Sequence, residues 1–171
     1  MEEIKKKIRD IPDFPKPGIV FKDITPLLAD SHSFQQVIDG FAKRYADKGI
    51  DYVVAIESRG FLFGAPLAYR LDAGFVPVRK KGKLPHKTDS VTYALEYGTD
   101  TLEIHQDAVH EGSRVLVIDD VLATGGTARA TCELVEKTGG KVVEFACLME
   151  LEFLNGREKL KGHEIYSLLK Y

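Results

Sequence analysis

The sequence has few cysteines and no long hydrophobic segment, and each shortage excludes a class of protein. Cys132 and Cys147 are isolated among the 171 residues and form no C-x-x-C pair or zinc-type spacing. We therefore expect two reduced, buried cysteines and no disulfide framework. No segment approaches about 18 consecutive apolar residues, and the start of the chain leads into no apolar signal region. The prediction is a cytoplasmic protein that is neither secreted nor membrane-spanning.

Neither sign of charge dominates the chain. Lysine and arginine together number 24 against 26 aspartates and glutamates, so the formal net charge is −2 at pH 7. A slightly acidic chain argues against a broad surface for polyanions, and we expect no nucleic-acid partner. The five histidines form no ligand-like cluster, so no metal site made of protein side chains alone is expected.

The sequence also contains no internal repeat, low-complexity tract or linker, and its 171 residues suit one domain. Helical spacing predicts an opening helix with Ile4, Ile8 and Ile11 on one face. A second predicted helix repeats apolar residues from Phe34 to Tyr45 and continues until Gly49, and further helices are predicted near 60–71 and near 126–138. Strands are predicted near 51–56, 74–79, 115–119, 141–149 and 163–168. This alternation indicates an α/β fold with a doubly wound, mostly parallel sheet.

The most informative element begins at the strand predicted near 115–119. Its apolar residues suit a strand buried on both faces of a parallel sheet, and Asp119 and Asp120 lie at its carboxyl end, where such sheets bind ligands. A turn then leads into the helix near 126–138. Its backbone N–H groups, glycines and hydroxyls suit one phosphate group; the residues are Ala123, Thr124, Gly125, Gly126 and Thr127.

Two common nucleotide-binding patterns, G-x-x-x-x-G-K-[ST] and G-x-G-x-x-G, are missing from the chain. The carboxylates instead precede the glycines, where they could reach hydroxyls of the ligand's own sugar. The plainer alternative is a solvated strand end followed by an ordinary turn before a capped helix. The full order favours ribose beside phosphate, and it resembles the phosphoribosyl-diphosphate (PRPP) signature of the type I phosphoribosyltransferases.

A second short element follows the apolar strand near 51–56, and it consists of Glu57, Ser58, Arg59 and Gly60. A small hydroxyl, an arginine and a glycine at a strand end can offer donors and a cation to an anionic group. The element resembles the pyrophosphate loop of the same family. That resemblance implies a non-proline cis peptide bond between Glu57 and Ser58.

A basic run from Arg79 to Lys87 concentrates cations on a predicted loop. A solvated loop and a nucleic-acid surface are the alternatives, and no aromatic residue within the run could stack on a base. The resemblance implies that Arg79, Lys80 and Lys83 bind the departing pyrophosphate, some of them from a neighbouring subunit.

Residues 88–105 alternate partially between apolar and polar types and predict a mobile hairpin. It forms most of a flexible lid loop over about 80–105, which would keep water from an activated sugar. Glu96 and Tyr97 coincide with lid residues of adenine phosphoribosyltransferases. The resemblance makes Glu96 the candidate proton carrier at N7 of the purine; without it, Glu96 would be an ordinary surface residue.

The N-terminal segment over about 8–28 holds three prolines and a glycine between Asp13 and Leu28, which exclude a regular helix there. It could form a hood over a ligand or an arm that packs on the core. Its motif resembles the hood of adenine phosphoribosyltransferases. The resemblance implies that Phe21 stacks on adenine, that Val20 and Lys22 lie near the base, and that Leu151 closes its other face. Many members carry arginine where this chain has Lys22, and lysine lacks the guanidinium fork.

The resemblance implies transfer of the 5-phosphoribosyl group from PRPP to N9 of adenine, giving AMP and pyrophosphate in purine salvage. Magnesium would be bound with PRPP, and the protein would be a homodimer. Asp119 and Asp120 would hold the ribose hydroxyls, and Arg59 would take the pyrophosphate with the lysines. Two alternatives stay open: a phosphoribosyltransferase for hypoxanthine, guanine or xanthine, and a non-catalytic regulator that senses PRPP.

Overall fold

The computed structural model describes residues 2–95 and 98–171, and its residue contacts separate the chain into two units, Met1–Lys43 and Arg44–Tyr171. That residues 1–171 form one domain stays a prediction.

The first unit contains a two-stranded antiparallel sheet and three helices. Strands β1 (Arg9–Pro12) and β2 (Val20–Asp23) pair along their whole length, with Ile11 opposite Phe21. The helices are α1 (Glu2–Lys5), α2 (Thr25–Ala29) and α3 (Ser31–Tyr45), whose last two residues fall in the second unit. The helix predicted from the spacing of Phe34 to Tyr45 is confirmed.

Two predictions for this unit are wrong in part. The opening helix ends at Lys5, and Ile11 lies in a strand, because a short helix is costly to nucleate while Arg9–Pro12 gains a complete ladder with β2. The proline-rich segment does contain a short helix, α2. Its Pro26 lies in the first turn, where a missing N–H breaks no helical hydrogen bond.

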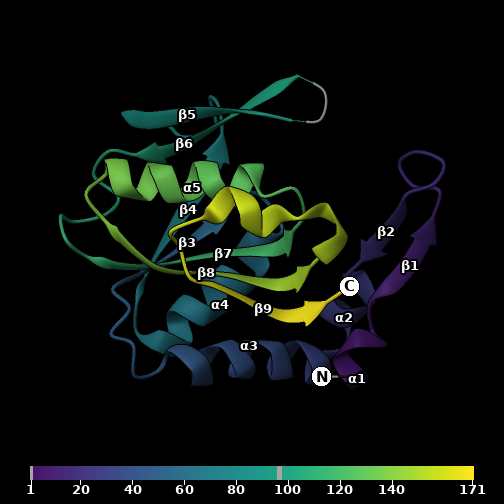
Figure 1. Cartoon of the computed structure of the whole chain (residues 1–171). Helices are drawn as coiled ribbons and strands as arrows, with labels where there is room; N and C mark the ends of the chain where they lie inside the picture. Colours follow the sequence, from purple (N-terminus) through teal and green to yellow (C-terminus); the bar gives the residue numbers. More distant parts are fainter. Residues whose placement is uncertain (1, 96–97) are drawn as a thin grey trace. The chain divides into compact units, whose positions relative to one another are not determined.

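The second unit is built on a seven-stranded sheet in the order β5-β6-β4-β3-β7-β8-β9 (Figure 1). The five strands β4, β3, β7, β8 and β9 are parallel, and β6 runs antiparallel to both of its neighbours, β4 and β5. The strands are β3 (Tyr52–Ile56), β4 (Gly74–Lys80), β5 (Thr88–Ala94), β6 (Thr99–His105), β7 (Arg114–Leu122), β8 (Lys141–Glu150) and β9 (Ile165–Lys170). The predicted doubly wound, mostly parallel sheet is confirmed.

Helices α4 (Gly60–Leu71) and α5 (Gly126–Lys137) cover opposite faces of this sheet, as Figure 1 shows. Two 3₁₀ turns, η1 (Glu152–Leu154) and η2 (Gly156–Leu160), connect β8 to β9. With both faces covered, the central strands are apolar along most of their length; Val53–Ile56 and Val115–Ile118 are buried. Cys132 and Cys147 are buried and unbridged, as predicted.

Strand β7 is longer than predicted, because its pairing with β8 continues to Leu122, opposite Glu150. The two aspartates therefore lie inside the strand, just before its end. The basic run is also not wholly a loop: Arg79 and Lys80 belong to β4, where they pair with β6.

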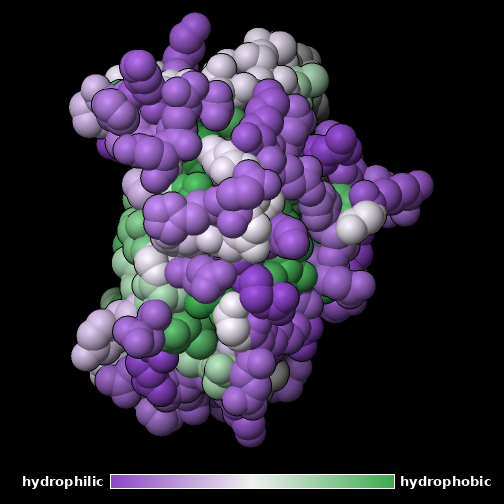
Figure 2. Space-filling view, turned by 90° about the vertical axis from the view of Figure 1, so that its left-hand side faces the viewer, coloured by the Kyte–Doolittle hydropathy of each residue, from purple (hydrophilic) through white to green (hydrophobic). Residues whose placement is uncertain are grey.

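The hairpin predicted over 88–105 is confirmed, since β5 and β6 pair from Thr88 and His105 to Ala94 and Thr99. Glu96 and Tyr97, the predicted lid residues, lie outside the described residues. Across residues 2–95 and 98–171, no helix has both the length and the hydropathy needed to cross a membrane. On the face displayed in Figure 2, hydrophilic residues cover most of the surface and hydrophobic ones show between them.

Candidate active site

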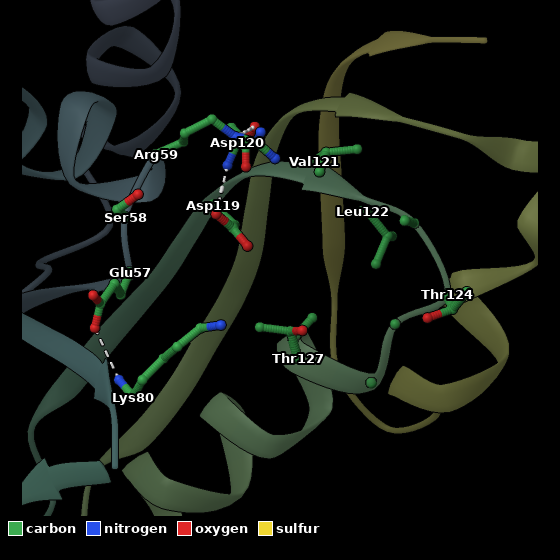
Figure 3. A pocket seen from close by; sticks show the side chains of 14 residues that line it. Glu57, Ser58, Arg59, Lys80, Asp119, Asp120, Val121, Leu122, Thr124 and Thr127 are labelled. Atoms are coloured by element: carbon green, nitrogen blue, oxygen red, sulfur yellow. Dashed lines mark hydrogen bonds and ion pairs between the residues drawn. The ribbon is translucent and has the colours of Figure 1, made fainter. Parts of the chain in front are cut away.

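A cavity of about 480 Å³ opens at the carboxyl ends of β3, β4 and β7 (Figure 3). Parallel strands end at one edge of their sheet, so residues far apart in sequence meet there. The cavity is lined by Glu57, Ser58, Arg59, Lys80, Asp119, Asp120, Val121, Leu122, Ala123, Thr124, Gly125, Gly126, Thr127 and Ala128. The structure thus brings together most of the residues predicted for PRPP.

Asp119 and Asp120 point to opposite faces of β7, as neighbours in a strand do. The Asp119 side chain points into the cavity in Figure 3, and its Oδ1 accepts a hydrogen bond from the Asp120 backbone N–H at 2.8 Å. Asp120 is buried, and its Oδ2 lies 2.6 Å from Nε of Arg59. Burial, and next the neighbouring Asp120 carboxylate, raise the pKa of Asp119 well above its ordinary value. Because the charged form of Asp119 is destabilised in this way, the site favours a ligand that supplies hydroxyl donors or positive charge.

The turn over Ala123–Thr127, called the phosphate turn below, joins β7 to α5. Gly125 has φ = +79°, a conformation that side-chain-bearing residues rarely adopt, and α5 begins at the next residue. In the described structure no side chain caps the start of α5, so its first N–H groups face an anion site. The Thr127 hydroxyl donates a hydrogen bond to Oη of Tyr93 at 3.2 Å, which links this turn to β5.

The loop over Glu57–Gly60, called the pyrophosphate loop below, contains the cis peptide bond implied between Glu57 and Ser58. Glu57 accepts a hydrogen bond from the Lys80 backbone N–H at 2.9 Å and pairs with Arg79 at 3.3 Å. The Lys80 hydrogen bond, together with Arg79, lowers the pKa of Glu57. A carboxylate engaged in this way orders the loop and the end of β4.

The predicted pyrophosphate cations differ in their placement. The Lys80 side chain points into the cavity, and its Nζ lies 3.3 Å from Oδ2 of Asp100 on β6 (Figure 3). Arg79 and Lys83 are not among the residues that line the cavity; Arg79 instead contacts Glu57 and the Lys83 carbonyl. A pyrophosphate role for these two residues stays a prediction.

The residues predicted for the base belong to different units. In the first unit, Phe21 makes an edge-to-face contact with Phe14, with ring centroids 5.3 Å apart, and Lys22 pairs with Asp10 at 2.6 Å. Val20 is exposed. In the second unit, Leu151 is partly exposed, and its N–H donates to the Leu122 carbonyl at 2.9 Å. Their role toward the base stays a prediction.

Sequence reasoning missed several residues at this site. Val121, Leu122 and Ala128 line the cavity and simply flank the predicted motifs. Tyr93 reaches the phosphate turn from the hairpin, and Gly156 packs directly under it. The Asn155-Gly156 pair carries a turn signal, but that signal says nothing about which segment the turn contacts.

Within the part of the chain that the structure describes, no group of three histidine, cysteine, aspartate or glutamate side chains is arranged to hold a metal ion. Asp120 is already engaged by Arg59, and Asp119 faces the cavity beside it. This donor set fits a cation that arrives with a phosphorylated ligand rather than one in a protein cage.

Comparisons with known proteins agree with this geometry. The phosphoribosyl transferase domain family matches residues 26–169. The adenine phosphoribosyltransferase of Geobacter metallireducens is 60% identical over 171 residues, covering 100% of both chains. The crystal structure of the Thermoanaerobacter pseudethanolicus enzyme of that name has a TM-score of 0.96 and 60% identity, covering 99% of each chain.

A third relative carries ligands. The Saccharomyces cerevisiae adenine phosphoribosyltransferase, complexed with D-2,5-dideoxy-2,5-imino-altritol 1,6-bisphosphate and adenine, is 44% identical with a TM-score of 0.93, covering 98% of this chain and 97% of its own. The matched regions extend over 98–100% of this chain. The chain therefore belongs to the phosphoribosyltransferase family, and within it to the adenine phosphoribosyltransferases.

Proposed function

We propose that this enzyme transfers the 5-phosphoribosyl group of PRPP to N9 of adenine, forming AMP and pyrophosphate in purine salvage. The observation that carries the proposal is one cavity of about 480 Å³ that joins the phosphate turn, the paired aspartates and the pyrophosphate loop. The names of the full-length relatives support adenine as the base.

In the reaction, N9 of the N7-protonated base attacks C1 of the ribose. The bond from C1 to the pyrophosphate oxygen breaks, and its electron pair leaves with pyrophosphate. Positive charge builds at C1 between these events, and Asp119 and Asp120 stabilise it while they accept hydrogen bonds from the ribose hydroxyls. The orientation of Asp119 toward the cavity and its raised pKa support this role.

The phosphate turn holds the 5-phosphate through its N–H groups and the hydroxyls of Thr124 and Thr127. Arg59 and Lys80 hold the pyrophosphate, with Ser58 and Gly60 offering polar and backbone groups of the pyrophosphate loop. Fixed groups at both ends of PRPP place C1 near the aspartates, so positioning and electrostatics carry the catalysis. Glu57 keeps the loop and Lys80 in place rather than touching an anion itself.

Magnesium would be held with PRPP rather than by a cage of protein side chains, and it would supply charge neutralisation on the pyrophosphate. Asp119 and the pyrophosphate loop lie where that complex would bind. The family resemblance assigns contact with adenine to Val20, Phe21 and Lys22 of the first unit and to Leu151 of the second. It assigns the proton transfer at N7 to Glu96, with Tyr97 beside it in the sequence. Glu96 receives the N7 proton, which completes the balance of the reaction.

We also propose a homodimer in the cytoplasm. Large apolar side chains are exposed on α4 and β4: Leu62 at 43%, Tyr69 at 86% and Phe75 at 38%. Exposed aromatic and aliphatic groups of this kind suit a surface shared by two copies. In such a dimer, Arg79 and Lys83 are candidates to reach the partner's pyrophosphate. Sedimentation at micromolar concentration, with Tyr69→Lys as the disrupting variant, tests this.

The test of the activity is a steady-state assay with PRPP, magnesium and each of adenine, hypoxanthine, guanine and xanthine. We expect AMP and pyrophosphate in equal amounts from adenine alone. Turnover with an oxopurine would keep the PRPP site and overturn the choice of base. PRPP binding without turnover would identify a regulator instead.

A further inference from the structure

Gly156, the first residue of η2, contacts the phosphate turn backbone to backbone. A Cβ atom at Gly156 would overlap the Ala123 carbonyl oxygen and lie 3.1 Å from a methyl carbon of Leu122. In the other direction, a Cβ atom at Gly125 would overlap the Gly156 carbonyl oxygen. The segment after β8 therefore supports the phosphate turn through direct contact between the two backbones, with no room for a side chain between them.

The neighbouring residue, Arg157, anchors this support to the sheet. Its Nε and Nη2 donate to the two carboxylate oxygens of Glu150 at 2.5 and 2.8 Å, and Ser167 donates to the same carboxylate at 2.7 Å. Arg157 also donates to Ser167 Oγ at 3.3 Å and to the Ile165 carbonyl at 3.5 Å. Arg157, Glu150 and Ser167 form what we call the Arg157 clamp.

The Arg157 clamp is fixed close to the phosphate turn. The Glu150 side chain is 3% exposed, and its residue pairs in the sheet with Leu122, the last residue of β7 before the turn. Two N–H donors on one buried carboxylate restrict the geometry of the pair, so Glu150 limits where Arg157 can lie. The position of Gly156 follows, because it is bonded directly to Arg157.

We infer that Arg157 and Glu150 are positioning residues for the reaction: through Gly156 they hold the phosphate turn in the shape that binds the 5-phosphate. The inference rests on the proposed phosphate role of the turn. It assigns a purpose to an ion pair with a buried carboxylate, whose two residues do not line the cavity. Turns that bind phosphate through N–H groups need their backbone held, since small displacements weaken several hydrogen bonds together.

The chain offers a matched control at the other end of β8. Arg44 donates to both carboxylate oxygens of Glu144 at 2.9 and 2.6 Å, and the Glu144 side chain is also 3% exposed. The Arg44 guanidinium carbon lies 4.0 Å from the Tyr166 ring centroid as well, so removing this arginine removes at least a comparable set of contacts. If losing such an arginine weakened ligand binding only through a general loss of packing, variants of Arg44 and of Arg157 would weaken it to the same extent.

The experiment measures Kd values of the full chain for ribose 5-phosphate and for magnesium pyrophosphate by calorimetry, with melting temperatures in parallel. The variants are Arg157→Ala, Arg157→Lys and Gly156→Ala, with Arg44→Ala and Arg44→Lys as controls. Ribose 5-phosphate has the 5-phosphate but no pyrophosphate group, so its Kd reports on the phosphate turn. Arg157→Lys keeps the charge without the two-pronged geometry, and Gly156→Ala disturbs the turn while the Arg157 clamp stays intact.

We expect Arg157→Ala and Gly156→Ala to raise the ribose 5-phosphate Kd about tenfold, and Arg157→Lys to raise it less, while pyrophosphate binding changes less than about twofold. The Arg44 variants should melt lower yet keep both Kd values. Arg157 and Gly156 variants that also keep the ribose 5-phosphate Kd would overturn the inference. If Arg157→Ala does not fold, Arg157→Lys and Gly156→Ala decide it. AMP formation by the unchanged chain tests the proposed function separately.

Discussion

Arg59 and Asp120 join the pyrophosphate loop to β7 through a 2.6 Å contact between the guanidinium and a buried carboxylate. The contact neutralises one of the two adjacent aspartates, so the charge of Asp119 is left facing the cavity. The two neighbouring carboxylates should therefore affect the stability of the folded protein differently, although both serve the same proposed step.

Asp119→Asn should separate stability from activity. The folded state raises the pKa of Asp119, so its favourable contribution is present below the ordinary value of 3.8 and is lost as pH rises through the raised value. The variant should therefore be more stable than the unchanged protein at pH 7 by about 0.5–2 kcal/mol, and not at pH 4. Turnover should fall by about 10²–10³-fold. Denaturation at the two pH values and an AMP assay check this; lower stability at pH 7 would contradict it.

Asp120→Asn should instead lower both stability and turnover. It puts a neutral amide where the native carboxylate is buried, so the charge-assisted contact with Arg59 is lost at a buried position. We expect a lower melting temperature together with reduced turnover. A variant as stable as Asp119→Asn would show that the Arg59 contact contributes nothing to folding.

Acid should destabilise the second unit through three glutamates. The Lys80 hydrogen bond and Arg79 lower the pKa of Glu57. Burial opposes ionisation of Glu144 and Glu150, but hydrogen bonds led by those from Arg44 and Arg157 outweigh it and lower both pKa values. Their stabilisation is present above the ordinary value of 4.5 and is lost as pH falls below it. The melting temperature should therefore fall steeply below about pH 4.5, and less steeply in Glu144→Gln, which cannot titrate there.

Lys80→Ala should distinguish the two anion sites. Lys80 points into the cavity, and its side chain is 59% exposed, so its loss should cost little stability. Pyrophosphate binding should weaken by about 10- to 100-fold, the value of a hydrogen bond to a charged group. The Kd for ribose 5-phosphate should stay the same. Equal weakening of both ligands would mean that Lys80 does not select the pyrophosphate end.

Tyr93→Phe should strengthen PRPP binding. The Thr127 hydroxyl donates to Tyr93 and must turn away to donate to a phosphate. Phenylalanine removes this competing acceptor, so KM for PRPP should fall by about two- to tenfold while KM for adenine is unchanged. A higher KM for PRPP would show that Tyr93 itself helps to bind the substrate.

The interior of the sheet and the order of the motifs were predictable because they depend on neighbours in the chain. The apolar residues Val115–Ile118 indicate a buried strand, and Asp119 and Asp120 follow them directly in the chain. The turn that leads into α5 needs a glycine, which Gly125 supplies. The opening helix was the clearest error. The apolar spacing of Ile4, Ile8 and Ile11 fits a helix, but pairing with β2 outweighed that local preference.

The sequence by itself determined the parallel sheet, the hairpin and the chemical character of each loop, since side-chain period and turn residues act over a few positions. Only the tertiary structure decided that Arg59 engages Asp120, that Lys80 rather than Arg79 lines the cavity, and that Gly156 supports the phosphate turn. These contacts join residues from separate elements at one edge of the sheet. No periodicity encodes such pairs, because they depend on how strand order and register bring distant segments together.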